Sequence, residues 1–135
     1  MSAETPETLL ATAREAAERA YAPYSRFRVG AVAVDEAGNQ FVGVNVENAS
    51  YGSTVCAEAS AVVAAAGTGV RRLERIAVVC LDGVNCYPCG NCRQILREFE
   101  IDQIIVEAAD GTARTHTLEE LLPNSFGPEA LDPGS

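Results

Sequence analysis

The sequence predicts an α/β fold with three layers, in which helices cover both faces of a mixed five-stranded sheet. Helical and strand-like patterns alternate along 135 residues, and no linker or internal repeat divides them, so a single domain over residues 1–135 is expected. Residues 75–81 contain an unbroken apolar run, which is typical of a strand covered on both faces. Residues 109–112 form a link too short for a parallel crossover, so the last two strands should be antiparallel.

The N-terminal third is predicted to form a helix followed by a β-hairpin. Thr5 before Pro6 indicates a helix start, since threonine caps a helix and proline suits its first position. Apolar residues at helical spacing continue as far as Ala20. Residues 27–34 alternate with a period of two and residues 41–46 form the returning strand, so these two strands should pair across a short turn.

A second helix is expected over residues 56–66, after a polar loop at residues 45–54. Ser53 or Thr54 could cap the start of this helix, and Gly67 would end it. The apolar strand at residues 75–81 then follows.

Residues 89–99 predict a third helix, and residues 103–107 and 113–117 predict the last two strands. The two strand–helix–strand connections before them should be parallel and right-handed. Both later helices begin where strands end, which is where open α/β sheets bind ligands. The tail from Pro123, rich in proline and glycine, is expected to be partly extended.

Composition and charge exclude several classes of function. The net charge is −9, from 19 acidic residues against 10 arginines with no lysine, which argues against a nucleic-acid partner because such partners require neutralised phosphates. No apolar run approaches the roughly 20 residues of a membrane span. The first ten residues lack the pattern of a secretory signal, so a cytoplasmic location is expected. In a reducing compartment, cysteines serve metal binding more often than disulfides.

Three of the five cysteines have the spacing of a metal site. Cys89 and Cys92 are separated by two residues at a helix start, and Cys56 begins the other core helix. Helix N-termini favour thiolates by lowering thiol pKa values, and thiolates bind Zn²⁺. Three protein ligands leave a fourth position for water, the arrangement of a catalytic zinc. Glu58 lies two residues from a ligand, close enough to act on that water.

A closed structural zinc site is the alternative. Cys86 lies three residues before Cys89, so four cysteines could surround the metal and leave no open position. Such a chain would be a zinc-stabilised module and not an enzyme. The place of Glu58 and the flanking motifs favour the open site.

Two cysteines and the single histidine are left without a metal role in the open arrangement. Cys80 lies on the apolar strand and is expected to be a buried core residue. Cys86 is expected to be a loop residue with no catalytic part. His116 lies in an edge-strand pattern and is expected at the surface, away from the metal.

The motifs of this chain resemble those of the small, tetrameric, zinc-dependent cytidine deaminases. Cys56-Ala57-Glu58 with Pro88-Cys89-Gly90-Asn91-Cys92 resembles the zinc signature of that family. Further similarity runs from Tyr24 to Ala31, from Asn45 to Gly52 and from Leu121 to Pro128. The resemblance covers nearly the whole chain and implies a cytidine deaminase-like fold.

The resemblance implies hydrolysis of free cytidine or deoxycytidine to the uracil nucleoside and ammonia. One Zn²⁺ per subunit would be held by Cys56, Cys89 and Cys92, and it would lower the pKa of a water molecule. Glu58 would take a proton from that water and pass it to N3 of the base and then to the departing ammonia.

The resemblance also assigns seven substrate-binding residues: Phe27, Asn45, Glu47, Ala49, Tyr51, Ala57 and Phe126. Asn45 and Glu47 would bind the ribose, although ordinary loop hydrogen bonds are the alternative reading of that pair. Phe27 would pack on the pyrimidine, unless it belongs to the strand core, and Ala57 would present backbone groups to the base. Phe126 would reach the site of a neighbouring subunit, with Ala49 and Tyr51 at the interface, so a homotetramer with shared sites is expected.

One position departs from the family pattern. Many members have an arginine after Cys-Ala-Glu that hydrogen-bonds the ligand sulfurs, whereas this chain has Ala59. Arg93, adjacent to Cys92, is a candidate for compensating the thiolate charge.

Two alternative kinds of enzyme share the zinc motifs: a deaminase of nucleoside antibiotics of the blasticidin type, and a polynucleotide-editing deaminase. The Asn45–Glu47 pair argues against the first, and the acidic charge and short final strand connection argue against the second.

Overall fold

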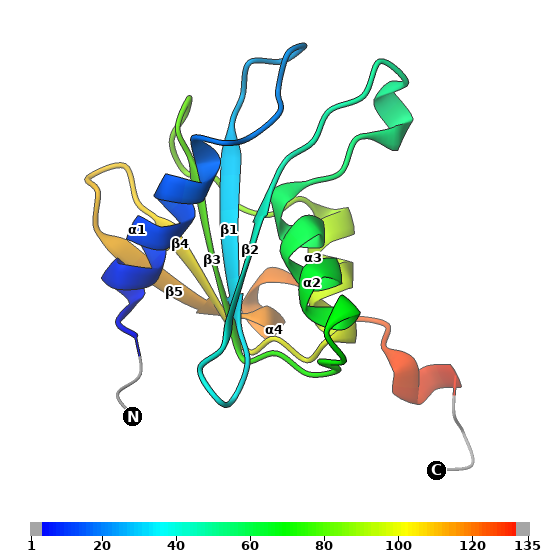
Figure 1. Ribbon diagram of the computed structural model, residues 1–135. Helices are drawn as coiled ribbons and strands as arrows, with labels where there is room; N and C mark the ends of the chain where they lie inside the picture. Colours follow the sequence, from blue (N-terminus) through cyan, green and yellow to red (C-terminus); the bar gives the residue numbers. More distant parts are fainter. Residues whose placement is uncertain (1–3, 132–135) are drawn as a thin grey trace.

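The computed structural model describes residues 4–131 and places five strands in one sheet (Figure 1). The elements in chain order are α1 (Pro6–Ala17), β1 (Val29–Val34), β2 (Gln40–Val44), the 3₁₀ helix η1 (Tyr51–Ser53), α2 (Ala57–Gly67), β3 (Arg75–Cys80), α3 (Gly90–Glu98), β4 (Gln103–Glu107), β5 (Ala113–Thr117), α4 (Leu118–Leu121) and the 3₁₀ helix η2 (Pro128–Leu131). Residues 1–3 and 132–135, which belong to the predicted single domain, lie outside the described part, as does the end of the predicted extended tail.

The sheet is mixed, as the sequence predicted, and its strand order is β2-β1-β3-β4-β5. β1 pairs antiparallel with both β2 and β3, and β3 pairs parallel with β4. β4 and β5 are antiparallel, which confirms the inference from the short link at residues 109–112. β2 and β3 run in the same direction, but β1 lies between them, so the connection through α2 does not join neighbouring strands.

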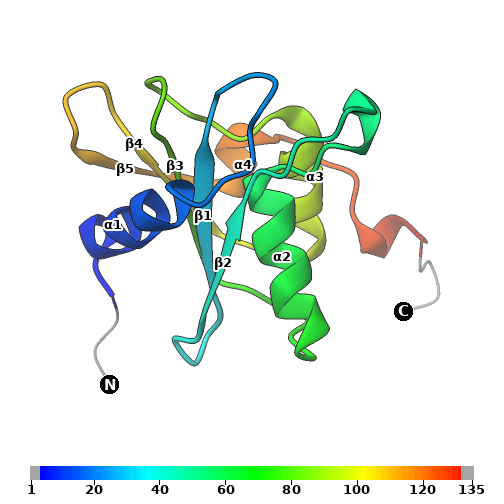
Figure 2. The same cartoon turned by 45° about the horizontal axis from the view of Figure 1, so that its top comes forward.

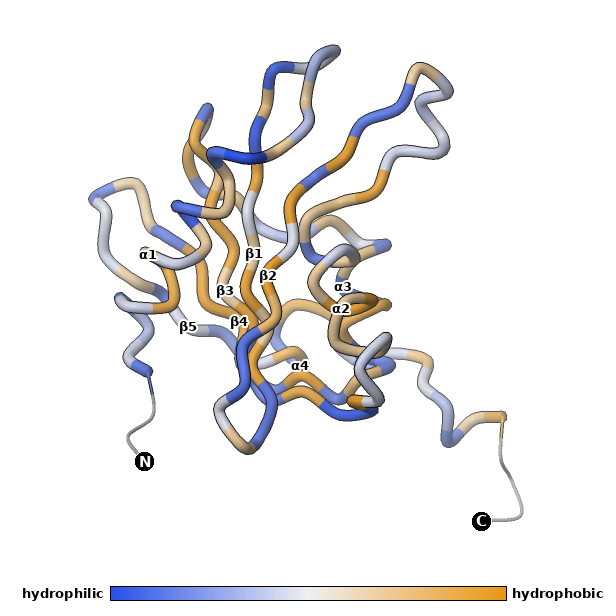
Figure 3. Tube along the Cα trace, in the orientation of Figure 1, coloured by the Kyte–Doolittle hydropathy of each residue, from blue (hydrophilic) through white to orange (hydrophobic). Residues whose placement is uncertain are grey.

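Helices cover both faces of the sheet (Figures 1 and 2). α1 packs against one face, and α2 with α3 packs against the other. Alternate residues of the central strands point to opposite faces of the sheet and form two hydrophobic cores. Val32, Ala77 and Ile105 belong to the core under α1. Ala31, Val78 and Ile104 belong to the core under α2 and α3. The central strands are accordingly the most hydrophobic part of the trace, and the turns are hydrophilic (Figure 3).

Two glycines let the helices approach the sheet closely. A Cβ added at Gly30 would lie 2.1 Å from the backbone oxygen of Ala13 in α1. A Cβ added at Gly43 would lie 2.3 Å from the backbone nitrogen of Ala61 in α2. Such distances are far below van der Waals contact. The position of α2, which begins after Cys56 and contains Glu58, therefore depends on having glycine at residue 43 of β2.

The predicted helix starts are partly corrected. Thr5 caps α1 as expected, with its hydroxyl accepting from the Thr8 amide at 3.1 Å. The capping of α2 by Ser53 or Thr54 is wrong, because residues 51–53 close their own short 3₁₀ helix. Cys56 occupies the N-cap position of α2, and Cys89 occupies that of α3.

Two strand boundaries also differ from the prediction, each by two residues. β1 starts at Val29 and not at Phe27, and β2 ends at Val44 and not at residue 46. Val46 forms isolated bridges with Tyr21 and Val55, which extend the edge of the sheet irregularly. Within residues 4–131, no helix is long and apolar enough to cross a membrane.

Candidate active site

The starts of α2 and α3 bring three cysteines together. Cys56 and Cys89 are the N-cap residues of these helices, and Cys92 lies in the first turn of α3. The sulfur atoms of the three all lie within 4.8 Å of one another. Three sulfurs are a donor set that suits zinc. Among the described residues this group does not include Cys86, so the geometry disfavours the closed four-cysteine alternative.

Burial governs the acidity of these thiols. It raises the pKa of Cys56 and of Cys92, and in Cys92 the nearby Glu58 carboxylate raises the pKa further. For both thiols the net pKa shift is therefore opposite to that expected from helix N-termini, because desolvation of the thiolate is its largest cause. A cation held by these sulfurs would supply the compensating charge and favour the thiolates.

Glu58 is a buried carboxyl group in the first turn of α2. It is 5% exposed, and burial raises its pKa, while the nearby Cys92 thiol acts weakly in the opposite direction. A raised pKa suits a carboxyl group that must both accept and donate a proton near neutral pH. The structure thus places a buried carboxyl group near the sulfur cluster.

The side-chain amide of Asn45 forms hydrogen bonds with the backbone at and just before the start of β1. Its Oδ1 accepts from the Val29 amide at 2.9 Å, and its Nδ2 donates to the Phe27 carbonyl at 2.8 Å. These contacts match the alternative of ordinary loop hydrogen bonding. They leave one amide hydrogen and one oxygen lone pair of Asn45 for another partner.

Glu47 holds the loop that precedes Phe27. Its Oε1 accepts from the Tyr24 amide at 2.9 Å and from the Ser25 amide at 3.1 Å, and its Oε2 accepts from the Ser25 hydroxyl. These hydrogen bonds, led by that from the Ser25 hydroxyl, lower the pKa of Glu47 and keep it ionised. The carboxylate is a fixed acceptor.

A cavity of about 330 Å³ adjoins the Glu47 carboxylate. Its lining comprises Tyr24, Ser25, Glu47, Tyr51 and Thr54. The rings of Tyr24 and Tyr51 meet edge to face, with centroids 5.9 Å apart. Two of the predicted substrate-binding residues, Glu47 and Tyr51, therefore line one cavity, together with the second tyrosine, Tyr24.

Phe27 lies outside the strand core. It precedes β1, is 39% exposed, and a Cβ added at Gly83 would lie 2.7 Å from its ring. Its ring thus rests on the backbone of the loop that leads to Cys89. Ala57 is buried at the first position of α2, next to Cys56, and Ala49 is exposed in the loop before η1.

Comparison with known proteins decides the family. Residues 3–108 match the sequence model of the cytidine and deoxycytidylate deaminase zinc-binding region, which includes all three clustered cysteines and Glu58. The chain belongs to the cytidine and deoxycytidylate deaminase family. Phe126 lies beyond the matched region.

Relatives over most of the chain are cytidine deaminases. The enzyme of Mycobacterium tuberculosis is 44% identical over 125 residues, which cover 91% of this chain and 90% of the relative. That of Sporosarcina psychrophila is 39% identical over 127 residues, 93% of each. The crystal structure of cytidine deaminase from Burkholderia pseudomallei aligns with a TM-score of 0.85 at 40% identity, covering 91% of this chain and all of that one.

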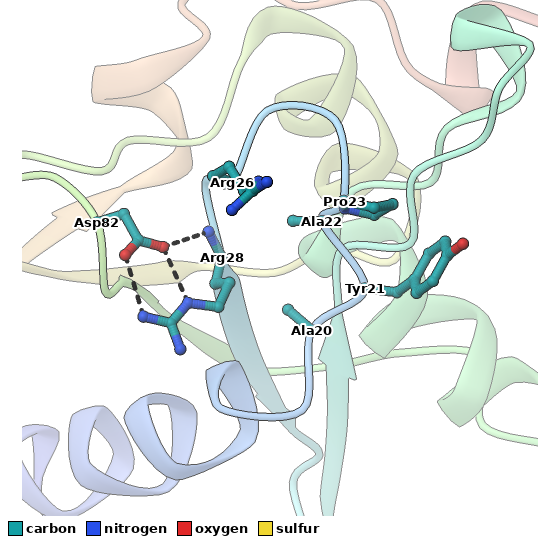
Figure 4. A pocket seen from close by; sticks show the side chains of 7 residues that line it. All are labelled: Ala20, Tyr21, Ala22, Pro23, Arg26, Arg28 and Asp82. Carbon is teal, nitrogen blue, oxygen red and sulfur yellow. Dashed lines mark hydrogen bonds and ion pairs between the residues drawn. The ribbon is translucent and has the colours of Figure 1, made fainter.

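This deaminase family member also has an ion pair that its sequence did not reveal. Asp82, after β3, accepts from the Arg28 amide at 2.8 Å and from its guanidinium at 3.0 Å (Figure 4). The pair borders a cavity of about 590 Å³, which is lined by residues of the 20–28 segment and by Asp82. None of the seven residues predicted to bind substrate lines this cavity. The two partners are 54 residues apart, so no local pattern could have paired them.

His116 and Arg93 are also placed differently from the prediction. His116 is half-buried and shares a 2.9 Å hydrogen bond with the Tyr87 hydroxyl, two residues before Cys89, so it is not a simple surface residue. Arg93 donates at 2.7 Å to the carbonyls of Pro88 and Leu121. These contacts direct Arg93 to backbone oxygens and not to the cysteine sulfurs. Cys80 is buried, as predicted.

Proposed function

We propose that this chain is a cytidine deaminase that hydrolyses free cytidine, deoxycytidine or both to the uracil nucleoside and ammonia. The observation that carries the proposal is the buried Glu58 carboxyl group near a cluster of three cysteine sulfurs. Relatives named cytidine deaminase, at 36–44% identity over most of the chain, support the same reaction. Such an enzyme would act in pyrimidine salvage as one domain over residues 1–135, in the cytoplasm, with no nucleic-acid or membrane partner.

The metal site would consist of Cys56, Cys89 and Cys92. Zinc bound there supplies a positive charge that lowers the pKa of water toward neutrality. Glu58 accepts the proton that water loses as its oxygen bonds to C4 of the base. The same carboxyl group then gives this proton to N3, takes the proton of the new hydroxyl group on C4 and delivers it to the leaving amine. The C4–N bond then breaks with loss of ammonia, and the C4 carbonyl of the uracil product forms. Burial raises the pKa of Glu58, which favours the protonated form that donates to the base.

Substrate would lie between the sulfur cluster and the cavity beside Glu47. The ionised Glu47 carboxylate offers an acceptor for sugar hydroxyls, and Asn45 adds its remaining amide hydrogen. Phe27, half-exposed on Gly83, presents an aromatic face to the pyrimidine. Ala57 would offer backbone groups to the base edge.

The active enzyme would be a homotetramer with shared sites. Large apolar side chains are exposed around the site loops, among them Tyr51 at 75% and Phe126 at 59%, with Val46 and Val55 close in sequence to η1. Exposed apolar groups of this size mark contact surfaces. Ala49 and Tyr51 would line the interface, and Phe126 would enter the substrate site of a neighbour.

One assay tests the assigned reaction. Purified protein is mixed with cytidine or deoxycytidine, and the loss of cytosine absorbance is followed together with ammonia release. The matched Glu58→Gln variant should keep its zinc and lose activity by a factor of about 10² to 10⁴, the usual worth of general acid–base catalysis. An inactive wild-type protein with full zinc content would refute the reaction, and an active variant would refute the role of Glu58.

A further inference from the structure

The C-terminal segment is fastened to the outer side of α3. After α4 the chain passes α3 and runs outward, away from the sheet (Figures 1 and 2). Gln94 donates to the Phe126 carbonyl at 2.9 Å. Arg97, one turn after Arg93, donates from Nε to the Ser125 hydroxyl at 2.9 Å and from Nη2 to the Glu129 carboxylate. Backbone groups on both sides of Phe126 are therefore tied to one helix.

Gly127 shows that this fastening requires close packing. A Cβ added at Gly127 would lie 2.3 Å from Arg97 Nη2, 2.5 Å from Arg97 Cζ and 2.7 Å from Glu129 Oε1. The guanidinium lies against the backbone of this buried glycine, and its contacts with Ser125 and Glu129 limit where it could move. A side chain at this position would displace the Arg97 guanidinium or the Glu129 carboxylate and so disturb the clamp, the contacts of Gln94, Arg97 and Gly127 around Phe126.

The clamp holds a backbone whose aromatic side chain points to solvent. Phe126 is 59% exposed although hydrogen bonds hold its backbone and its neighbours. Ordering a backbone residue costs roughly 1–2 kcal/mol, and a flexible segment must meet that cost when it binds. A segment ordered in advance on α3 meets the cost during folding, so its aromatic ring binds a target more tightly.

We propose that Arg97, Gln94 and Gly127 are positioning residues that present Phe126 to the substrate site of a neighbouring subunit. The inference rests on the proposed function, which places Phe126 in that site. α3 would then serve two active sites at once, since its first turn holds Cys89 and Cys92 of its own subunit and its last turns hold Phe126 for the neighbour. None of these three residues needs to touch the reacting atoms.

Steady-state kinetics with cytidine separate positioning from chemistry. Arg97→Gln and Gly127→Ala should each raise KM about tenfold, equivalent to about 1.4 kcal/mol, while kcat and zinc content stay near wild type. Arg97→Lys should give an intermediate KM because an ammonium can pair with Glu129 but lacks the second donor geometry for Ser125. Arg114→Gln, which removes the same charge from an exposed position on β5, is the matched control and should leave KM unchanged.

Gln94→Ala and Ser125→Ala provide a second route if an Arg97 variant fails to fold. Each removes one hydrogen bond of the clamp and keeps the guanidinium in place. Their combination should raise KM, again with little change in kcat. A wild-type KM in the folded double variant would overturn the proposal.

Mixed oligomers test whether the clamp acts across subunits. Co-expressed Glu58→Gln subunits, inactive alone, should supply an intact clamp to active sites of Arg97→Gln subunits and restore a fraction of low-KM activity. Glu58→Gln/Arg97→Gln subunits should not restore this activity.

The Phe126→Ala variant separates failure of the clamp from failure of the proposed function. If Phe126→Ala raises KM while the Arg97→Gln protein does not, the clamp is refuted and the proposed contact stands. If neither variant raises KM, the contact of Phe126 with substrate is itself refuted. A third outcome also overturns the proposal. If Phe126→Ala and Arg97→Gln both raise KM but the mixed oligomers do not restore low-KM activity, the clamp acts only within its own subunit.

Discussion

At the scale of single residues, burial decides the chemistry of the candidate site. Desolvation raises the pKa of Glu58 and of the Cys56 and Cys92 thiols, so these groups favour their neutral forms until a cation is near. The same cluster that would bind zinc therefore binds protons when zinc is scarce. Metal affinity and the proposed proton transfer by Glu58 would therefore depend on one shared environment.

The four-cysteine alternative can be tested with two serine variants. Cys92→Ser should lose most of its zinc because serine replaces a buried thiolate ligand. Cys86→Ser, the matched control, should keep one zinc per chain, because Cys86 does not belong to the sulfur cluster. Metal analysis of the purified proteins measures both, and loss of zinc in the Cys86 variant would support the closed site.

Ala59 offers a test of how the thiolate charge is balanced. It is half-buried on α2, one residue after Glu58, and Arg93 is bound elsewhere. In Ala59→Arg, a guanidinium able to reach the sulfurs should make the metal a stronger Lewis acid. Turnover of cytidine should rise by up to about tenfold, the effect of one hydrogen bond to a charged group. Unchanged kcat and unchanged zinc affinity would contradict this account.

At the scale of elements, close contacts between helix, strand and loop set where the site residues stand. α2 carries Cys56 and Glu58 and rests directly on β2 at Gly43. The loop after β3 leads to Cys89, and Asp82 within it is bound to Arg28 at the start of β1. The site therefore depends on contacts that lie outside it.

Gly43→Ala should destabilise the fold. The new Cβ would meet backbone atoms of Ala57 and Ala61, which cannot move without displacing α2, and overpacking of this kind costs roughly 3 kcal/mol. Gly67→Ala is the control: it ends the same helix, nothing lies within 4 Å of the added Cβ, and a gain of up to about 1 kcal/mol is expected. Urea unfolding measures both, and equal midpoints for the two variants would refute the close-contact argument.

The Arg28–Asp82 pair predicts a dependence of stability on pH. Hydrogen bonds from Arg28 lower the pKa of Asp82 in the folded protein. A group whose folded pKa lies below its unfolded value of about 3.9 stabilises the fold above that value, and the contribution is lost as pH falls through the folded pKa. Asp82→Asn should thus be less stable than wild type at neutral pH, and the difference should shrink below about pH 4. A difference in urea midpoint that stays constant from pH 7 to pH 3 would contradict this linkage.

At the scale of the whole molecule, the sheet with its helical layers leaves large aromatic side chains exposed beside the candidate site. Tyr51 and Phe126 are the most exposed aromatic residues, and one chain buries neither. Their exposure is explained if further copies of the chain cover them.

Light scattering should find an assembly of about four times the 14.2 kDa of one chain. Tyr51→Arg places a charge on the proposed interface and should shift the protein toward smaller species with weaker cytidine deamination. The exposed Arg114→Gln variant serves as the control and should remain assembled. A monomeric wild-type protein with full activity would refute the shared site.

Much of the fold could be predicted because its signals are local. The apolar run of β3, the helical spacing of α1 and the short link before β5 each depend on a few neighbouring residues. Cys56, Glu58, Cys89 and Cys92 could be selected for the same reason, since their types and spacing carry the chemistry. Helix caps were less predictable, because η1 competes for the residues before α2.

The sequence by itself determined the five strands, the helices α1, α2 and α3, and the mixed sheet with its antiparallel last pair, and it selected the candidate metal-binding and proton-carrying residues. It did not predict η1, α4 or η2, and η2 lies in the tail that was expected to be partly extended. Only the tertiary structure decided that β1 lies between β2 and β3, that Asn45 is bound to the backbone before β1, and that α3 holds the segment around Phe126. It also decided the direction of the thiol pKa shifts. The physical reason is range: hydrophobic period and ligand spacing act between near neighbours, whereas burial, strand order and hydrogen bonds between distant residues exist only when the chain has folded.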